Sequence, residues 1–268
     1  MSKSFDIIGS KEKAVAIIEI SDEEVGKERE IAEKILKEHN NVRSVLKKES
    51  ARRGDYRTRQ YKLIAGDENT EVLHKEHGYA LKLDPQKAYF SNRESTERQR
   101  VAKLVKAGEF VMVMFAGVGP YAIAIAKTQP DVDKIIAVEI NPDAVEYMKH
   151  NVRINKISHK IVPVLGDVRM ACERWYGKCD RVVMPLPLGA EDFLDVAVKC
   201  LRNEGIIHFY NWGEEPDLFS KAVELVKKSL KDEKVEYEIT DKRVVLPYSP
   251  RKYKVCVEVK FKKLKQVK

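Results

Sequence analysis

Hydrophobic and polar residues follow two different patterns, one before and one after about residue 90. In the first part, the apolar, β-branched run at 13–20 predicts a strand. Glu24 lies three residues after Ser21 and forms a capping box with it, so we predict a helix from Ser21 to about residue 40. The apolar stripe of this helix is Val25, Ala32, Ile35 and Leu36. Further strands are predicted at 42–46, 61–65, 71–74 and 79–83, which makes residues 1–90 a small α+β domain.

Strands and helices alternate from Glu94 onward. Strands are predicted at 110–114, 134–139, 161–165, 181–184 and 205–210. One helix is predicted between Glu94 and the first of these strands, and another from the glycine turn after that strand to Lys127. Further helices are predicted at 143–155, 191–201 and 216–230. Such alternation is typical of an α/β domain with a doubly wound parallel sheet, here over residues 91–268. About seven residues join two final strands at 235–245 and 253–262, fewer than a parallel crossover needs. We therefore predict an antiparallel last strand.

Composition narrows the class of protein. The 268 residues include 50 Lys and Arg against 42 Asp and Glu, a net charge of +8. This surplus fits a polyanionic partner such as nucleic acid, and it also fits an ordinary solvated surface. No apolar run approaches the roughly 18 residues of a membrane span, and no apolar signal core follows Met1, so we expect a cytoplasmic protein. Four cysteines without metal-ligand spacing predict free thiols and no metal site.

The segment 110–121 predicts a strand, a glycine turn and the start of a helix. Gly117 and Gly119 in this turn let the backbone approach a ligand, and a helix N-terminus favours negative charge. Ala122 stands where the dinucleotide fingerprint has its third glycine, which argues against NAD.

Acidic residues follow the next two strands. Glu139 ends its strand 22 residues after Gly117, where a carboxylate can accept hydrogen bonds from ribose hydroxyls. Asp167 follows the strand 161–165 and can meet an adenine amino group. The alternative for Glu139 is a surface residue at a strand end, and the alternative for Asp167 alone is a turn residue. Together, strand ends with Gly, Glu and Asp predict an adenosine site, and the single Gly-x-Gly favours S-adenosylmethionine.

Several short motifs carry a more specific resemblance. They are Met-Phe-Ala-Gly-Val-Gly-Pro at 114–120, Glu-Ile-Asn-Pro at 139–142, Asp-Tyr-Arg-Thr-Arg at 55–59, His-Lys-Glu-His-Gly at 74–78, Lys-Ala-Tyr-Phe-Ser at 87–91, Thr-Glu-Arg at 96–98 and Tyr-Ser-Pro-Arg at 248–251. Jointly they resemble the archaeal and eukaryotic tRNA (guanine-N1)-methyltransferase family that modifies position 37. The resemblance covers about residues 5–262 and implies a class I S-adenosylmethionine-dependent methyltransferase sheet.

The resemblance implies roles for particular residues. Glu97 would be the general base that removes the guanine N1 proton, and Arg57 would stabilise the negative charge that develops on the base. The implied cofactor contacts are Tyr89, Ser91, Arg93, Arg98, Phe115, Gly117, Glu139, Ile140, Asn141, Asp167 and Val168. Candidate contacts to tRNA phosphates are Arg52, Arg53, Arg59, Arg251 and Lys252, although a solvated basic face has the same composition.

The chain departs from the family pattern at three points. Val113 replaces a usual Asp, so Arg57 is expected to be oriented differently. Pro185 replaces a usual Asn and offers the base a carbonyl but no side-chain amide. Many archaeal members also have a further N-terminal domain for the tRNA elbow. This chain is expected to start at the second domain, so recognition of the whole tRNA would be weaker or supplied by a partner.

Three functions stay open. The first is methylation of N1 of guanine 37 in tRNA, or of a tricyclic derivative of that base. The second is transfer of the aminocarboxypropyl group of S-adenosylmethionine to a wybutosine precursor, the reaction of the sister family. The third is a cofactor- or RNA-binding module without catalysis, suggested by Val113 and Pro185. The expected partner is the anticodon region of tRNA, with no membrane contact, and a monomer is expected.

Overall fold

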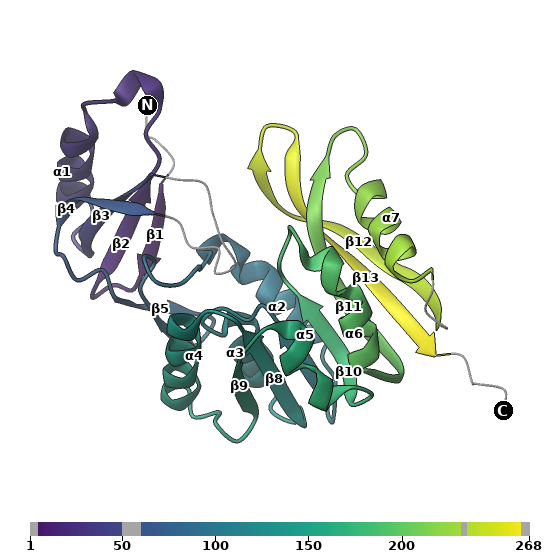
Figure 1. Ribbon diagram of the computed structural model, residues 1–268. Helices are drawn as coiled ribbons and strands as arrows, with labels where there is room; N and C mark the ends of the chain where they lie inside the picture. The colour runs from purple at the N-terminus through teal and green to yellow at the C-terminus, as the bar shows by residue number, and fades with distance from the viewer. Residues whose placement is uncertain (1–4, 50–59, 232–234, 264–268) are drawn as a thin grey trace, which may run out of the picture. The chain divides into compact units, whose positions relative to one another are not determined.

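Residues 5–49, 60–231 and 235–263 are described in the computed structural model (Figure 1). The chain forms two contact units. Unit 1 comprises residues 1–95, 117–119 and 141–156, and unit 2 comprises residues 96–116, 120–140 and 157–268. Unit 1 thus includes two short segments from beyond residue 95, and the domain boundary near residue 90 stays a prediction.

Unit 1 contains a four-stranded sheet in the order β1-β2-β3-β4. Its strands are β1 (Asp6–Gly9), β2 (Ala14–Ile18), β3 (Val42–Lys48) and β4 (Tyr61–Gly66). Helix α1 (Glu28–Glu38) connects the parallel pair β2 and β3, and its Ala32 and Ile35 pack with Ala14, Ala16 and Val45 in one apolar cluster. The short strand β1 was not predicted from the sequence.

The predicted helix from Ser21 is wrong in its first turns. Ser21 and Glu24 do form the capping box, but it begins only a 3-10 helix, η1 (Asp22–Glu24). Gly26 then adopts φ +91°, a left-handed conformation that an α-helix cannot include, and α1 begins at Glu28. Val25, which we predicted on the apolar stripe, is 69% exposed as a result.

A second group of elements in unit 1 pairs a hairpin with a helix. The hairpin consists of β5 (Val72–Glu76) and β6 (Tyr79–Leu83), which pair antiparallel. Helix α4 (Pro142–Ile154) packs against β6. The 3-10 helix η2 (Asn92–Glu94) lies against β1.

Unit 2 is built on a seven-stranded sheet in the order β12-β13-β11-β10-β7-β8-β9. Its strands are β7 (Phe110–Met114), β8 (Lys134–Glu139), β9 (Ile161–Leu165), β10 (Cys179–Met184), β11 (Leu201–Glu214), β12 (Val235–Ser249) and β13 (Lys252–Lys263). The strands β9, β8, β7, β10 and β11 are parallel to their neighbours in this order. Strand β13 is antiparallel to both β11 and β12, which confirms the predicted antiparallel last strand.

The α-helices of unit 2 are α2 (Ser95–Leu104), α3 (Pro120–Thr128), α5 (Val168–Ala171), α6 (Leu194–Cys200) and α7 (Ser220–Ser229). The first residue of α2, Ser95, is assigned to unit 1. Unit 2 also contains the 3-10 helices η3 (Glu173–Trp175) and η4 (Ala190–Phe193). The helix predicted at 191–201 is therefore a 3-10 turn followed by α6. Among the described residues, no helix combines the length and apolar character needed to cross a membrane. All four cysteines are buried and free, as predicted.

Alternation along the strands gives this sheet two different faces. Ile207 and Phe209 of β11 belong to a large apolar cluster with residues of α6 and α7, which lie side by side against β11 (Figure 1). His208 and Tyr210 alternate with these two residues along β11 and therefore point to the opposite face. Strand β13 alternates in the same way, because Val255 and Val257 join the apolar cluster while Cys256 does not. The second face carries the polar network described below.

Candidate active site

The carboxyl ends of β7, β8 and β9 form one edge of the unit 2 sheet. The register pairs Met114 with Val138 and Glu139 with Leu165, so the residues that follow the strands also lie close together. The N–H of Gly166 donates to the carbonyl of Glu139 at 3.0 Å. The predicted positions Phe115, Glu139 and Asp167 are thus brought to a single sheet edge, where ligands bind in open α/β sheets.

Two carboxylates lie at this edge in different surroundings. Glu139 is 9% exposed, and its Oε1 accepts from the backbone N–H of the neighbouring predicted residue, Ile140, at 2.9 Å. Asp167 is the N-cap of α5 and accepts from the N–H of Arg169 at 2.7 Å. Val168, which follows it, is buried. Asp167 is therefore partly committed to its helix cap, whereas Glu139 is a buried acceptor at a strand end.

Phe115 has an unusual backbone for a residue with a side chain. Its φ is +54°, in the left-handed region that costs L residues free energy and is frequent at functional sites. Its ring meets that of Phe193 edge to face at 5.2 Å, and the guanidinium of Arg169 lies 4.6 Å from the Phe193 ring centroid. An aromatic surface therefore lies directly after β7.

Unit 1 holds several of the other predicted cofactor residues. Gly117 has φ +56°, and a Cβ there would lie 3.6 Å from the carbonyl oxygen of Tyr89. Asn141 caps α4, because its Oδ1 accepts from the N–H of Asp143 at 3.0 Å, and its Nδ2 donates to the carbonyl of Lys87 at 2.9 Å. Gly117 thus lies beside the Tyr89 backbone, and Asn141 binds the backbone of Lys87, two residues before Tyr89.

The remaining predicted cofactor residues have mixed surroundings. Ser91 is the N-cap residue of η2. Arg93 is about half exposed and donates to Asp6 at 2.6 Å. Arg98 on α2 is only 1% exposed. The cofactor assignment of these three residues stays a prediction.

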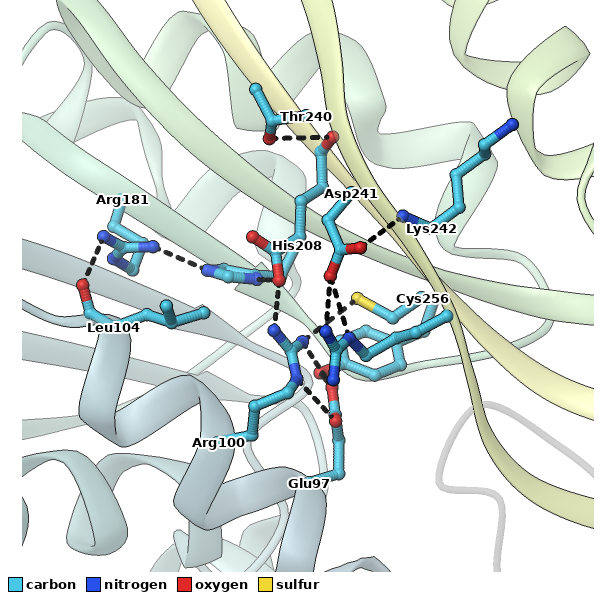
Figure 2. A network of polar contacts seen from close by, with 12 residues as sticks. Glu97, Arg100, Leu104, Arg181, His208, Thr240, Asp241, Lys242 and Cys256 are labelled. Atoms are coloured by element: carbon cyan, nitrogen blue, oxygen red, sulfur yellow. Dashed lines mark hydrogen bonds and ion pairs between the residues drawn. The ribbon is translucent and has the colours of Figure 1, made fainter.

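Glu97 is buried on α2 and held by charged and neutral donors (Figure 2). Its Oε1 accepts from Arg100 Nη2 at 2.7 Å and from the Tyr210 hydroxyl at 2.5 Å, and its Oε2 accepts from Arg100 Nε at 2.8 Å. Burial raises the pKa of Tyr210 well above its usual value, so this phenol is a hydrogen-bond donor at neutral pH. The carboxylate is thus fixed in orientation.

The network continues from Arg100 along the polar face of the sheet (Figure 2). Arg100 Nη1 also donates to Glu258 Oε1 on β13. His208 Nε2 accepts from Arg181 Nη1 at 2.7 Å, because a guanidinium can only donate. The imidazole is neutral, since burial lowers its pKa more than Glu258 raises it. Its N–H is therefore on Nδ1, which faces Glu258 Oε1 at 3.6 Å.

The sequence analysis missed most of this network. Arg100 lies three residues after Glu97 and could have been paired with it by helical spacing. Tyr210 and Glu258 approach Glu97 and Arg100 from strands 113 and 158 residues away in sequence. No local pattern indicates such contacts, because the alternation along β11 and β13 shows which face a side chain is on but not which distant residue it meets there.

Glu258 carries a prediction for stability at acidic pH. Burial opposes its charge, but His208 and Arg100 lower its pKa from the usual 4.5 to about 2. Its ionised form therefore stabilises the fold above about pH 4.5, and this contribution is lost as the pH falls toward about 2. We expect urea unfolding at several pH values to show a steeper loss of unfolding free energy in the wild type than in Glu258→Gln over that window. Equal slopes in the two proteins would contradict this linkage.

The loop after β10 contains one of the departures from the family pattern. The carbonyl of Pro185 accepts from Lys254 Nζ at 2.9 Å. Lys254 is 2% exposed, and its ammonium lies 5.0 Å from the centroid of the Tyr210 ring. The Pro185 carbonyl, which we expected to be available to the base, is thus engaged by a buried cation. Val113, another of the three departures, is fully buried in β7.

The predicted phosphate contacts fall into two groups. Arg52, Arg53 and Arg59, together with the predicted catalytic Arg57, lie outside the described residues. Arg251 and Lys252 lie at the β12–β13 turn. The Arg251 side chain is 73% exposed, and its Nε lies 3.4 Å from Glu215 Oε2. Lys252 Nζ lies 2.8 Å from Glu214 Oε1. Both cations thus have acidic neighbours.

Known proteins are similar to this chain over most of its length. A family model described as the TRM5/TYW2 methyltransferase domain matches residues 72–240, and one described as the TYW2 N-terminal domain matches residues 1–70. The chain is 42% identical to the tRNA (guanine(37)-N(1))-methyltransferase Trm5b of Pyrococcus abyssi, over 95% of this chain and 74% of the relative. It is 33% identical to the tRNA(Phe) (4-demethylwyosine(37)-C(7)) aminocarboxypropyltransferase of Methanocaldococcus jannaschii, over 79% and 83% of the two chains. The structure of aTrm5 in complex with tRNALeu is similar with a TM-score of 0.84 and 37% identity, over 97% and 72% of the two chains.

Proposed function

The chain belongs to the TRM5/TYW2 methyltransferase family, and we propose that it methylates N1 of guanine 37 in tRNA with S-adenosylmethionine as the methyl donor. The observation that carries this proposal is the oriented Glu97 carboxylate on α2. Guanine N1 bears a proton at neutral pH and is a poor nucleophile until that proton leaves. A carboxylate held in one orientation supplies the base that removes the proton from guanine N1.

Glu97 acts in the proposed mechanism as the proton acceptor. Among the described residues its Oε2 accepts only from Arg100 Nε, which leaves a second lone-pair direction on this oxygen for the N1–H. Arg100 and Tyr210 keep the carboxylate in one orientation, so little reorganisation precedes proton transfer. From the family resemblance, Arg57 would stabilise the negative charge on the deprotonated base.

The residues at the unit 2 sheet edge fit the proposed cofactor. S-adenosylmethionine, when bound, supplies an electrophilic methyl group on a sulfonium. Glu139 offers a buried carboxylate for ribose hydroxyls, and Asp167 offers an acceptor for the adenine amino group. The rings after β7 and the apolar Val168 offer surfaces for a flat base. From the family resemblance, the further proposed contacts are Tyr89, Ser91, Arg93, Arg98, Gly117, Ile140 and Asn141.

The proposed partner is tRNA, approached at its anticodon region because position 37 adjoins the anticodon. The net charge of +8 supports binding to a polyanion. The strongly exposed Arg251 is proposed as a phosphate contact, and so is Lys252. We also propose that the protein acts as a monomer in the cytoplasm.

Aminocarboxypropyl transfer is the second candidate function. The observation in its favour is the 33% identity to an aminocarboxypropyltransferase that acts at the same tRNA position. That reaction forms a bond to carbon 7 of a tricyclic base and releases the proton of carbon 7, so it also uses a base and Glu97 is compatible with both reactions. The higher identity of 42% to a tRNA (guanine(37)-N(1))-methyltransferase favours methylation.

One experiment separates these functions. Unmodified tRNA is incubated with the protein and S-adenosylmethionine, and its nucleosides are analysed by mass spectrometry. We expect 1-methylguanosine that disappears when guanine 37 is replaced. A donor labelled at the methionine carboxyl carbon labels the tRNA only if the aminocarboxypropyl group is transferred. Absence of 1-methylguanosine in all unmodified tRNA preparations would refute the proposal.

A further inference from the structure

Asn151 of α4 and Asn155, the C-cap residue of that helix, bind the edge of β6 as a neighbouring strand would. Asn155 Oδ1 accepts from the N–H of Ala80 at 3.0 Å, and its Nδ2 donates to the carbonyl of Ala80 at 2.6 Å. Asn151 makes the same pair of hydrogen bonds with Lys82. Its Oδ1 accepts from the N–H of Lys82 at 2.6 Å, and its Nδ2 donates to the carbonyl of Lys82 at 3.0 Å. The four-residue spacing on the helix thus matches the two-residue spacing on the strand, and side-chain amides continue the β5–β6 hairpin.

Each of the two amides makes a second donation, and the acceptors differ. Asn155 Nδ2 also donates to the carbonyl of Asn151 at 2.8 Å, whereas Asn151 Nδ2 also donates to the carbonyl of Val118 at 3.1 Å. Val118 is fully buried and lies between Gly117 and Gly119, whose φ angles are +56° and +88°. Asn151 is itself 0% exposed. One buried side chain therefore joins the hairpin, the helix and the glycine turn.

The orientation of the Asn151 amide is determined by its partners. Two carbonyls and one N–H surround it, so the NH₂ group must face the carbonyls of Lys82 and Val118 and the oxygen must face the N–H of Lys82. No rotation of the amide satisfies all three partners in another way. The Val118 carbonyl is thus held in one direction by a group that cannot turn away at low cost.

We propose that Asn151 is a positioning residue for cofactor binding, which acts by fixing the Val118 carbonyl and with it the left-handed backbone of the turn 117–119. This inference rests on the proposed function, in which the turn approaches S-adenosylmethionine. A turn with two left-handed glycines has many alternative conformations, so an anchor at its central residue lowers the entropy lost on binding. Asn155 holds the same hairpin without touching the turn, and is a matched control.

The test compares Asn151→Ala with Asn155→Ala in the full chain. Both variants lose hydrogen bonds to β6, so both are expected to lower the melting temperature by similar amounts. Only Asn151→Ala is expected to raise the dissociation constant of S-adenosylmethionine, by about tenfold in isothermal titration calorimetry, while Asn155→Ala stays within about twofold. Equal changes in affinity for the two variants, or none, would overturn the inference.

A second measurement is independent of the cofactor. Hydrogen exchange of the 117–119 amides in the cofactor-free protein is expected to speed up about tenfold in Asn151→Ala and to stay unchanged in Asn155→Ala. If the wild type does not bind S-adenosylmethionine, the proposed function fails, and this exchange comparison alone decides the inference. If Asn151→Ala does not fold, Asn151→Gln replaces it, because its longer stem keeps the amide but displaces its donors. Unchanged exchange at the turn in that variant would refute the role of Asn151.

Discussion

Replacing Glu97 with Gln is expected to slow 1-methylguanosine formation by about 10³-fold while the affinity for S-adenosylmethionine stays within about twofold. The amide has nearly the shape of the carboxylate, and its oxygen can still accept from Arg100 or Tyr210. It cannot take the proton from guanine N1, so the loss falls on the rate of the chemical step. Single-turnover kinetics with saturating tRNA and donor measure that rate directly.

The matched control for this variant is Glu109→Gln. Like Glu97, Glu109 accepts two hydrogen bonds from one arginine. Buried Arg181 donates from Nε to one Glu109 carboxylate oxygen at 2.8 Å and from Nη2 to the other at 2.9 Å. It makes no contact with Glu97 among the described residues. We expect this control to lose stability but to keep most of the wild-type rate. If Glu97→Gln and Glu109→Gln slow the reaction equally, Glu97 is not the base.

Replacing Glu139 with Ala is expected to raise the dissociation constant of S-adenosylmethionine by about 100-fold. A buried carboxylate that accepts from both ribose hydroxyls makes two charge-assisted hydrogen bonds, each worth about 1.5 kcal/mol or more. Their sum of about 3 kcal/mol corresponds to about two orders of magnitude in affinity. Isothermal titration calorimetry measures the change without any tRNA.

The control for Glu139 lies at the opposite end of the same strand. Asp133 is exposed immediately before β8, so Asp133→Ala removes an acidic residue without touching the carboxyl edge of the sheet. We expect it to bind S-adenosylmethionine with wild-type affinity. A Glu139→Ala protein that binds within about threefold of wild type would show that the ribose is held elsewhere.

The parts of the fold that the sequence predicts well are those with strong local signals. The strands 79–83, 110–114, 134–139 and 161–165 have the bounds that we predicted. Each is a short run rich in apolar residues between polar or glycine-containing segments, so periodicity and turn residues suffice to place it. The strand ends that bring Phe115, Glu139 and Asp167 together follow from this pattern and from the parallel order.

The parts that were missed depend on contacts between distant segments. The turn at Gly26 interrupts a helix whose capping box and apolar residues are both present, because nothing local shows that Val25 lacks a partner. The contacts of Glu258 with Arg100 and of Asn151 with Lys82 each join residues far apart in the chain. Such pairings are set by tertiary packing, which no window of sequence contains.

The alternation along β13 also limits how this part of the chain can change in length during evolution. Lys254, Cys256 and Glu258 point to the polar face and Val255 and Val257 to the apolar one, in a strand whose pairing with β12 is set by the short turn between Ser249 and Lys252. A single-residue insertion or deletion in this strand would exchange the faces of every residue beyond it. It would place valines against Arg100 and a glutamate in the apolar cluster. Length variation within β13 is therefore expected in steps of two residues.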